Sequence, residues 1–275
     1  MSNIGLAKIS GNDALDFLNR MSTNDLTNLK PGHYKKTVLT NDKGRIIDLI
    51  YVLNAGNFSY LLTSAIYLDK VIEHLDKYVI MDDVKFEKIN DAANCYIKLD
   101  SIDGAITEFN VNDDLIFFYD KFKLSKKILI DIQNKGIPEV EVILPKEEFE
   151  QIRIENLIPA APNEINENIN PVECGLNEYV SYNKGCYIGQ EVIARLDAQG
   201  KIPKQMKLFS CDSNINPDDK IYFEIKDEKK ECGFVSSYLN NINEGLCFIR
   251  SVNLNPDYKY FVNTNNNFIP IKIIK

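Results

Sequence analysis

Residues 182–200 read YNKGCYIGQEVIARLDAQG and combine a glycine-rich turn with the start of a helix. Two glycines, Gly185 and Gly189, flank a Cys-Tyr-Ile triplet. Apolar residues then recur at helical spacing, and Gly200 is a typical helix stop. The pattern predicts a short helix over residues 190–198, with these apolar positions: Ile188, Val192, Ile193 and Leu196.

The thiol of this turn, Cys186, lies just before the predicted helix N-terminus. Free amide groups there favour negative charge, and Lys184 is two residues away. Both effects would lower the pKa of the thiol and favour the reactive thiolate. Because glycines carry no side chain, a ligand or a second protein could approach this backbone closely. A second interpretation stays open, in which Cys186 is a small buried residue and the glycines only form the turn.

The composition indicates an ordinary globular chain. Of its 275 residues, 44% are hydrophobic, and the formal net charge is −8 without a basic stripe, which argues against nucleic-acid binding. The six cysteines form no C-x-x-C pair, which argues against a zinc ribbon or a disulfide framework. No signal peptide and no long apolar run is evident. We therefore expect a soluble cytoplasmic protein with reduced thiols and no membrane contact.

The order of elements along the chain predicts an α+β protein. A strand at residues 4–10, a helix from Ala14 and a hairpin turning at residues 41–44 come first. A helix near residues 65–81 is expected to bury Ile66, Val71, Ile72, Leu75 and Tyr78, and two strands follow it. Another helix starts at residue 145 and leads into a long loop rich in proline and asparagine. Short β-type runs after residue 201 predict a small barrel or sandwich.

The segment KGCYIGQEVIAR, residues 184–195, resembles the Lys-Gly-Cys-Tyr-x-Gly-Gln-Glu signature of the YgfZ-type folate-binding-like proteins. These proteins are relatives of the glycine-cleavage T-protein, an aminomethyltransferase. Further stretches match in the same order: ISGNDALDFLNRMSTNDL, LTNDKGRIIDLIYVL, RIENLIPAAPNEI and NPVECGLNEYVSYNKGCY. The resemblance covers most of residues 9–208, and the last seventy or so residues are similar only in character.

The resemblance implies a three-domain ring around a central folate-type pocket. The first domain would combine residues 1–53 with 146–200, which carry the KGCYxGQE motif. Residues 54–145 would form an inserted α+β domain of ferredoxin-like type, and residues 201–275 a small C-terminal β-barrel.

The resemblance also implies a role in the assembly, maintenance or repair of iron–sulfur clusters. Cys186 would be the functional thiol and a possible bridging ligand to iron, with no metal site inside the chain. Lys184 and Tyr187 would shape its turn, and Gln190 and Glu191 would line the adjacent pocket. The implied cofactor is tetrahydrofolate or a related folate. The implied partners are iron–sulfur assembly factors and client iron–sulfur enzymes. We expect the protein itself to be a monomer.

A second hypothesis is a tetrahydrofolate-dependent aminomethyltransferase. Aminomethyltransferases carry a Gly-Gly-x-x-Asp-Asp pattern at the second hairpin strand, where this chain has Ile47 and then Asp48. Asp48 is thus the one acid available for such a transfer, and a solvent-facing strand position is its alternative interpretation. Arg45 and Arg195 are candidates for binding the glutamate tail of a folate. A third hypothesis is a binding module whose pocket has lost its use.

A few other residues bear on these hypotheses. His33 and His74 are expected at the surface, which leaves a Cys-His nucleophilic pair with little support. Cys174 could come close to Cys186 in space. Arg153 and Glu155 could form a buried ion pair. Aromatic residues that could stack on a pterin are Tyr34, Tyr182 and Tyr187.

Overall fold

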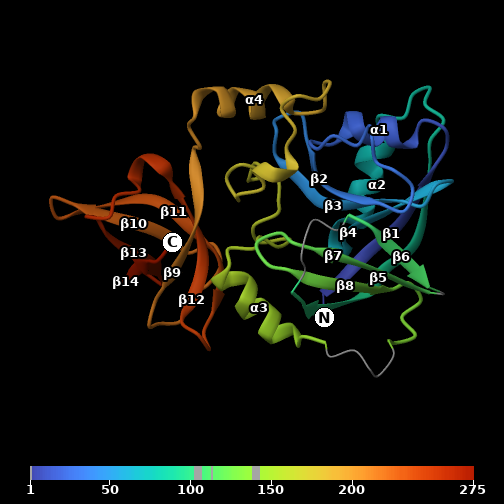
Figure 1. Ribbon diagram of the computed structural model, residues 1–275. Helices are drawn as coiled ribbons and strands as arrows, with labels where there is room; N and C mark the ends of the chain where they lie inside the picture. Colours follow the sequence, from blue (N-terminus) through green and yellow to red (C-terminus); the bar gives the residue numbers. More distant parts are fainter. Residues whose placement is uncertain (1, 102–106, 113, 138–142) are drawn as a thin grey trace.

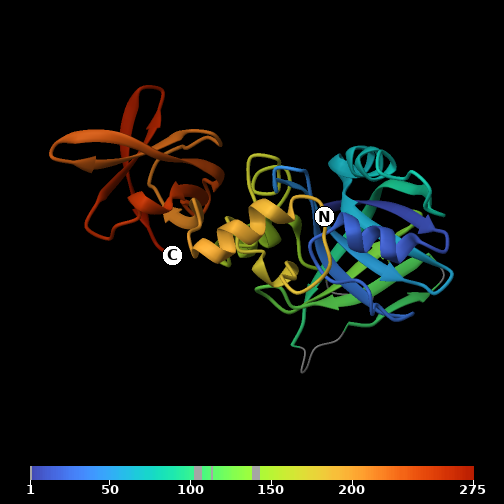
Figure 2. The same ribbon diagram turned by 90° about the horizontal axis from the view of Figure 1, so that it is seen from above.

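The computed structural model describes residues 2–101, 107–112, 114–137 and 143–275. A curled β-sheet with two helices forms one half of the molecule, and a closed β-barrel forms the other (Figure 1). Between them lie two further helices and a long loop (Figure 2). None of the predicted site residues falls in the gaps of the described chain.

The N-terminal elements match the prediction of a strand, a helix and a hairpin. Phe17, Leu18 and Met21 face inward from the helix, at the spacing of one helical face. The hairpin turns at residues 41–45, where Gly44 has a φ of +65°. The elements are β1 (Ser2–Ser10), α1 (Ala14–Met21), β2 (Tyr34–Thr40), β3 (Ile46–Asn54) and β4 (Phe58–Ser64).

The next segment adds a helix and four strands. Val71 and Leu75 are buried as predicted, but Ile66 is 63% exposed, so its predicted burial is wrong. Ile66 lies in a 3₁₀ turn before the helix and thus outside the helical periodicity. The two strands predicted after the helix are one strand, β5. The elements are η1 (Ala65–Tyr67), α2 (Leu68–Asp76), β5 (Lys85–Leu99), β6 (Phe109–Asn112), β7 (Leu115–Asp120) and β8 (Lys126–Asp131).

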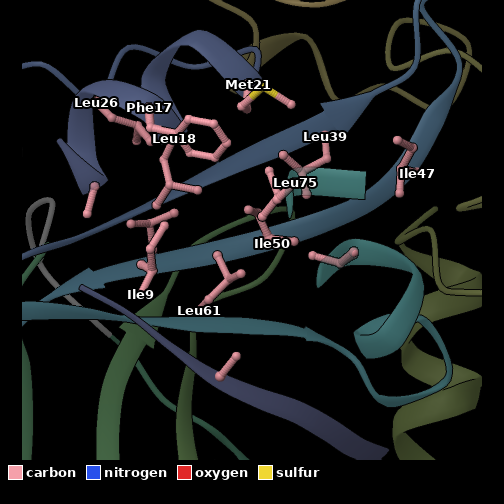
Figure 3. Packing of buried hydrophobic residues seen from close by; sticks show 14 of the residues in the cluster. Ile9, Phe17, Leu18, Met21, Leu26, Leu39, Ile47, Ile50, Leu61 and Leu75 are labelled. Atoms are coloured by element: carbon pink, nitrogen blue, oxygen red, sulfur yellow. The ribbon is translucent and has the colours of Figure 1, made fainter. Parts of the chain in front are cut away.

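The eight strands form one sheet in the order β2-β3-β4-β1-β5-β8-β7-β6. The sheet curls until its two edges touch, where the Tyr34 amide donates to the Thr107 carbonyl at 2.7 Å. Helices α1 and α2 cover the outer face and bury the apolar cluster of Figure 3. A second cluster, including Phe118 and Ile130, fills the inside of the curl. The sheet runs without a break past residue 54, and the division into a first and an inserted domain stays a prediction.

The C-terminal strands close into a six-stranded barrel, which confirms the predicted β-barrel. Its strand order is β10-β11-β12-β9-β14-β13, and its core contains Phe209, Cys247 and Val262. Asn265 and Asn266, both with positive φ, form the hairpin turn between the paired residues Thr264 and Asn267. The elements are β9 (Lys204–Ser210), β10 (Lys220–Ile225), β11 (Glu228–Leu239), β12 (Glu244–Arg250), η3 (Ser251–Asn253), β13 (Lys259–Thr264) and β14 (Asn267–Ile273).

The two halves are joined through α3 (Lys146–Glu155), a loop with η2 (Asn177–Tyr179), and α4 (Gln190–Gln199). Apolar residues of the sheet, this loop and the barrel share one core, which includes Val38, Tyr179 and Phe248. The fold is thus a mixed α+β architecture with a C-terminal barrel.

A buried ion pair ties α3 to the barrel. Arg153 Nη1 lies 3.3 Å from Glu164 Oε2, and the Ser237 hydroxyl of β11 donates to Glu164 Oε1 at 2.7 Å. Arg153 also binds Glu150 at 2.7 Å, whereas Glu155 accepts a hydrogen bond from a glutamine. The expected pairing of Arg153 with Glu155 is therefore wrong, because residues two apart on a helix point in different directions.

Candidate functional site

Cys186 is exposed, whereas the other five cysteines are buried. The interpretation of Cys186 as a buried residue is therefore excluded. The predicted proximity of Cys174 has no support. Cys174 is fully buried, and its Sγ lies 3.7 Å from the carbonyl oxygens of Asn170 and Pro171. The turn before α4 thus presents one accessible thiol.

Lys184 anchors this turn to the end of α1. Its ammonium donates hydrogen bonds to the carbonyls of Asn19, Ser22 at 2.8 Å and Asn24 at 2.7 Å. Burial lowers the pKa of Lys184 to about 8. All three donor positions of the ammonium are occupied by backbone acceptors. Lys184 thus shapes the turn as predicted, but it does so by holding the chain rather than by facing the thiol.

Gly189 fixes the other end of the turn. It has a φ of +82° and lies directly against the β2–β3 hairpin. A Cβ here would stand 2.5 Å from the Asn41 carbonyl oxygen and 2.9 Å from Gly44 Cα. By contrast, a Cβ on Gly185 would meet nothing within 4 Å. The predicted close approach of a ligand or protein is therefore possible at Gly185, whereas at Gly189 the hairpin fills that space.

The residues around Cys186 fall into two groups. Tyr187 is buried among Val180 and Ile193, and its amide donates to Gln190 Oε1 at 3.3 Å. The Tyr187 hydroxyl is buried and has no hydrogen-bond partner in the described part of the chain. Three charged side chains of α4 are exposed and make no ion pair with any described residue: Glu191, Arg195 and Asp197.

Arg45 binds the loop that follows α3. Its Nη1 lies 3.2 Å from Glu173 Oε2 and donates to the Asn168 carbonyl at 3.1 Å. Burial raises the pKa of Glu173, and the nearby cations of Lys204 and Arg45 oppose that rise. This cluster connects the hairpin, the loop and β9.

Asp48 lies on the wall of a cavity of about 530 Å³ between the sheet and α3. Its carboxylate accepts hydrogen bonds from the Leu49 amide at 2.9 Å, the Ser64 amide at 2.7 Å and the Ser64 hydroxyl at 2.8 Å. Burial raises the pKa of Asp48 to about 6. Asp48 has no exposed surface, so the solvent-facing interpretation is wrong. Tyr51 and Lys146 also line the cavity.

The structure separates the Asp48 cavity from the turn that carries the thiol. The described lining of the cavity includes Asp48 but not Cys186. It also lacks the residues predicted to contact a folate: Lys184, Tyr187, Gln190, Glu191, Arg195 and Arg45. Folate binding by these residues stays a prediction.

A buried charge cluster lies next to the cavity, and no pattern in the sequence indicates it. Lys36 and Lys126 lie 3.3 Å and 2.7 Å from Asp120 Oδ2, to which the Tyr51 hydroxyl donates at 2.9 Å. Burial lowers the pKa of Lys36 to about 8. For Asp120, burial would raise the pKa, but the two cations outweigh it and lower the pKa. Tyr51 connects this cluster to the cavity wall.

The histidines do not complete a site with Cys186. His33 and His74 are both partly buried rather than fully exposed, and neither contacts the thiol. Within residues 2–101, 107–112, 114–137 and 143–275, no group of three or more His, Cys, Asp or Glu residues is placed to hold a metal ion. In the same residues, no helix is both long and apolar enough to cross a membrane.

Comparison with known proteins shows which proteins the chain is similar to. Residues 1–98 match the GCVT N-terminal domain. An aminomethyltransferase of Caldanaerobacter subterraneus is 23% identical over 269 residues, which cover 86% of this chain and 71% of the relative. The chain is similar to aminomethyltransferases along most of its length. The YgfZ-type subgroup stays a prediction.

Two further matches agree with this relationship. A chloroplastic protein of Arabidopsis thaliana, whose name assigns it to the transferases, is 25% identical over 271 residues. The chain covers 62% of that protein's length. The glycine cleavage aminomethyltransferase T of Bartonella henselae superposes with a TM-score of 0.76 over 99% of this chain and 83% of its own. At 14% identity, this superposition shows that the fold is shared.

Proposed function

We propose that this protein is a cytoplasmic accessory factor for assembly, maintenance or repair of iron–sulfur clusters in partner enzymes, acting through Cys186. One observation carries the proposal. Cys186 is the one exposed thiol of six, and Lys184 and Gly189 fix the turn that carries it. A thiol held at the surface and outside the Asp48 cavity is suited to act on another protein. The KGCYIGQE sequence supports the iron–sulfur assignment by its resemblance to the YgfZ-type signature.

The chemistry of a single exposed thiol limits what the turn can do alone. A thiolate can ligate iron or form a mixed disulfide. A cluster needs about four such ligands, so the remaining ones would come from the partner protein. The exposed Glu191 and Arg195 of α4 flank the turn and offer charges of both signs to such a partner.

Tetrahydrofolate or a related folate would fit the Asp48 cavity by size. Its volume of about 530 Å³ lies in the range of small-molecule sites. Tyr51 and Ile165 supply flat or apolar wall, and Lys146 supplies a cation for a carboxylate tail. The folate would supply one-carbon carrier chemistry. The central pocket of a three-domain ring would then be this cavity.

The alternative function, a tetrahydrofolate-dependent aminomethyltransferase, draws support from one observation. The raised pKa of Asp48, about 6, suits an acid–base group at neutral pH. However, three protein donors already occupy this carboxylate. We therefore favour the thiol-dependent role.

Complementation with two variants separates the two functions. Wild type, Cys186→Ser and Asp48→Asn are expressed in cells that lack their own relative, and an iron–sulfur enzyme is assayed under oxidative stress. The proposal expects rescue by wild type and Asp48→Asn but not by Cys186→Ser. Equal rescue by Cys186→Ser would overturn it. Purified proteins are assayed in parallel for one-carbon transfer to tetrahydrofolate, and transfer that is lost in Asp48→Asn supports the alternative.

A further inference from the structure

A cavity of about 880 Å³ opens at one end of the C-terminal barrel. Residues of β9, β10, β11, β13 and β14 line it, together with the segment 254–258 between η3 and β13. It shares no described lining residue with the Asp48 cavity. Neither of the functions considered above uses this part of the molecule.

Lys207 is the residue that points to a ligand. It alternates along β9 with Met206 and Leu208, which pack outside the barrel, and lies on the same face as Phe209 of the barrel core. Burial raises the pKa of Cys247 in this core, and the charge of Lys207 opposes that rise, as expected for a cation facing the interior. Lys207 is partly buried and has no ion pair among the described residues. A half-desolvated cation without a counter-ion attracts an anion.

The charge of the cavity contrasts with that of the whole chain. Its lining has four lysines and one glutamate, whereas the chain has a formal net charge of −8. Glu224 lies 3.2 Å from Lys229 Nζ and 4.0 Å from Lys259 Nζ, so its carboxylate offsets part of the positive charge of these two lysines. Lys207 and Lys272 have no acidic partner in the described lining. The cavity therefore has an excess of positive charge that the protein leaves uncompensated.

Apolar and aromatic groups form the rest of the lining. Tyr258 stacks on Phe223 with ring centroids 4.9 Å apart, which holds its ring at the barrel end. Leu254, Ile271 and Ile273 add aliphatic surface. The Tyr260 hydroxyl is already bound to the carbonyls of the 253–255 segment, so polar recognition falls to the lysine ammonium groups.

We propose that this barrel cavity is a binding site for a small amphipathic anion, with an aromatic or other flat apolar body and a phosphate or carboxylate group. The apolar body would lie against Tyr258 and Ile271, and the anionic group would reach Lys207 and Lys272. The lysine ammonium group is a compact charge that binds either phosphate or carboxylate, so the proposal covers anions of both kinds. The volume suits a ligand of nucleotide size better than a protein segment.

Fluorescence titration of the full-length protein with anilinonaphthalene sulfonate, an aromatic anion, tests this site. We expect one saturable site whose affinity falls at least about 10-fold in Lys207→Gln and in Lys272→Gln. Lys230→Gln is the matched control, because this exposed barrel lysine does not line the cavity. Higher salt should also weaken binding. Displacement by adenosine monophosphate identifies phosphate as the preferred group, and displacement by phthalate identifies carboxylate.

Three results would overturn the proposal. They are the absence of saturable binding to the wild type, equal affinity in the lysine variants, and an equal loss in Lys230→Gln. An acidic peptide that binds through Lys207 and Lys272, when the aromatic anion does not, would replace it with a protein-docking role. Thermal unfolding of each variant checks that it folds. Because Lys272 is exposed, Lys272→Gln keeps the test valid even if Lys207→Gln fails to fold.

Discussion

Gly189 and Gly44 lie directly against each other, and the Gly189 carbonyl oxygen is 3.2 Å from the place where a Cβ on Gly44 would stand. Both glycines have positive φ. This contact joins the start of α4 to the β2–β3 hairpin, and the Thr40 hydroxyl reinforces it by donating to the Ile188 carbonyl at 2.6 Å. The position of the thiol turn therefore depends on a contact between two backbones.

Replacing Gly189 with alanine should destabilise the protein by about 2–4 kcal/mol. The new Cβ would be strained at positive φ and would overlap the Asn41 carbonyl oxygen, 2.5 Å away. Urea unfolding measures the change. Gly185→Ala is the control, since it has open space and should change stability by less than about 0.5 kcal/mol. Equal effects of the two variants would contradict the packing role of Gly189.

Native protein should react quickly with a thiol reagent at one position. Cys186 is exposed, and the five other cysteines are buried and should react only on unfolding. Counting the thiols that dithionitrobenzoate labels before and after denaturant checks this. Cys186→Ser should remove the fast phase and leave the slow one. A fast phase that persists in this variant would show that another cysteine is accessible.

Asp48 should make stability fall as pH rises from about 4 to about 6. Its pKa is raised from 3.8 to about 6, so the folded state binds this proton more tightly than the unfolded state does. This stabilisation is fully present at pH values below the unfolded-state pKa of 3.8 and is lost as the pH rises through the folded-state pKa of about 6. The difference corresponds to about 3 kcal/mol. Urea unfolding of wild type and Asp48→Asn across this range should show a pH-dependent difference between them, and parallel curves would refute the assignment.

Removing the charge of Glu164 should destabilise the protein by about 3 kcal/mol, because it leaves buried Arg153 with only one carboxylate partner. Glu164→Gln also weakens the hydrogen bond that Ser237 of the barrel donates. Glu155 lies on α3, the helix that carries Arg153, but outside this network, so Glu155→Gln should have little effect on stability. Denaturant unfolding of both variants provides the comparison. A loss in Glu164→Gln no larger than in Glu155→Gln would mean that the network contributes little.

The local elements could be read from the sequence, because their signals lie within a few residues. The hairpin before Gly44, the end of α4 at Gly200 and the barrel strands all follow from periodicity and turn residues. Within the candidate site, the sequence also indicated Cys186 as the thiol to examine. These predictions needed no knowledge of which segments meet in space.

The contacts of the site could not be predicted, because their partners are distant in sequence. Lys184 binds carbonyls about 160 residues earlier, at Ser22 and Asn24. The burial of Asp48 could not be predicted, because strand alternation does not reveal that both faces of β3 are covered. The ion pair between Arg45 and Glu173 joins residues that are 128 positions apart in the sequence.

Strand β5 has a mechanical consequence. Its first part pairs with β1 and its last part with β8, so one continuous backbone joins the strands β2, β3, β4 and β1 to the strands β8, β7 and β6. A curled sheet whose two edges are hydrogen-bonded to each other resists bending at any single residue. A change in the width of the Asp48 cavity must then come from its other wall, formed by α3 and residues 159–165. Arg153 and Glu164 connect that wall to Ser237 of the barrel. A displacement of the barrel would therefore widen or narrow the cavity.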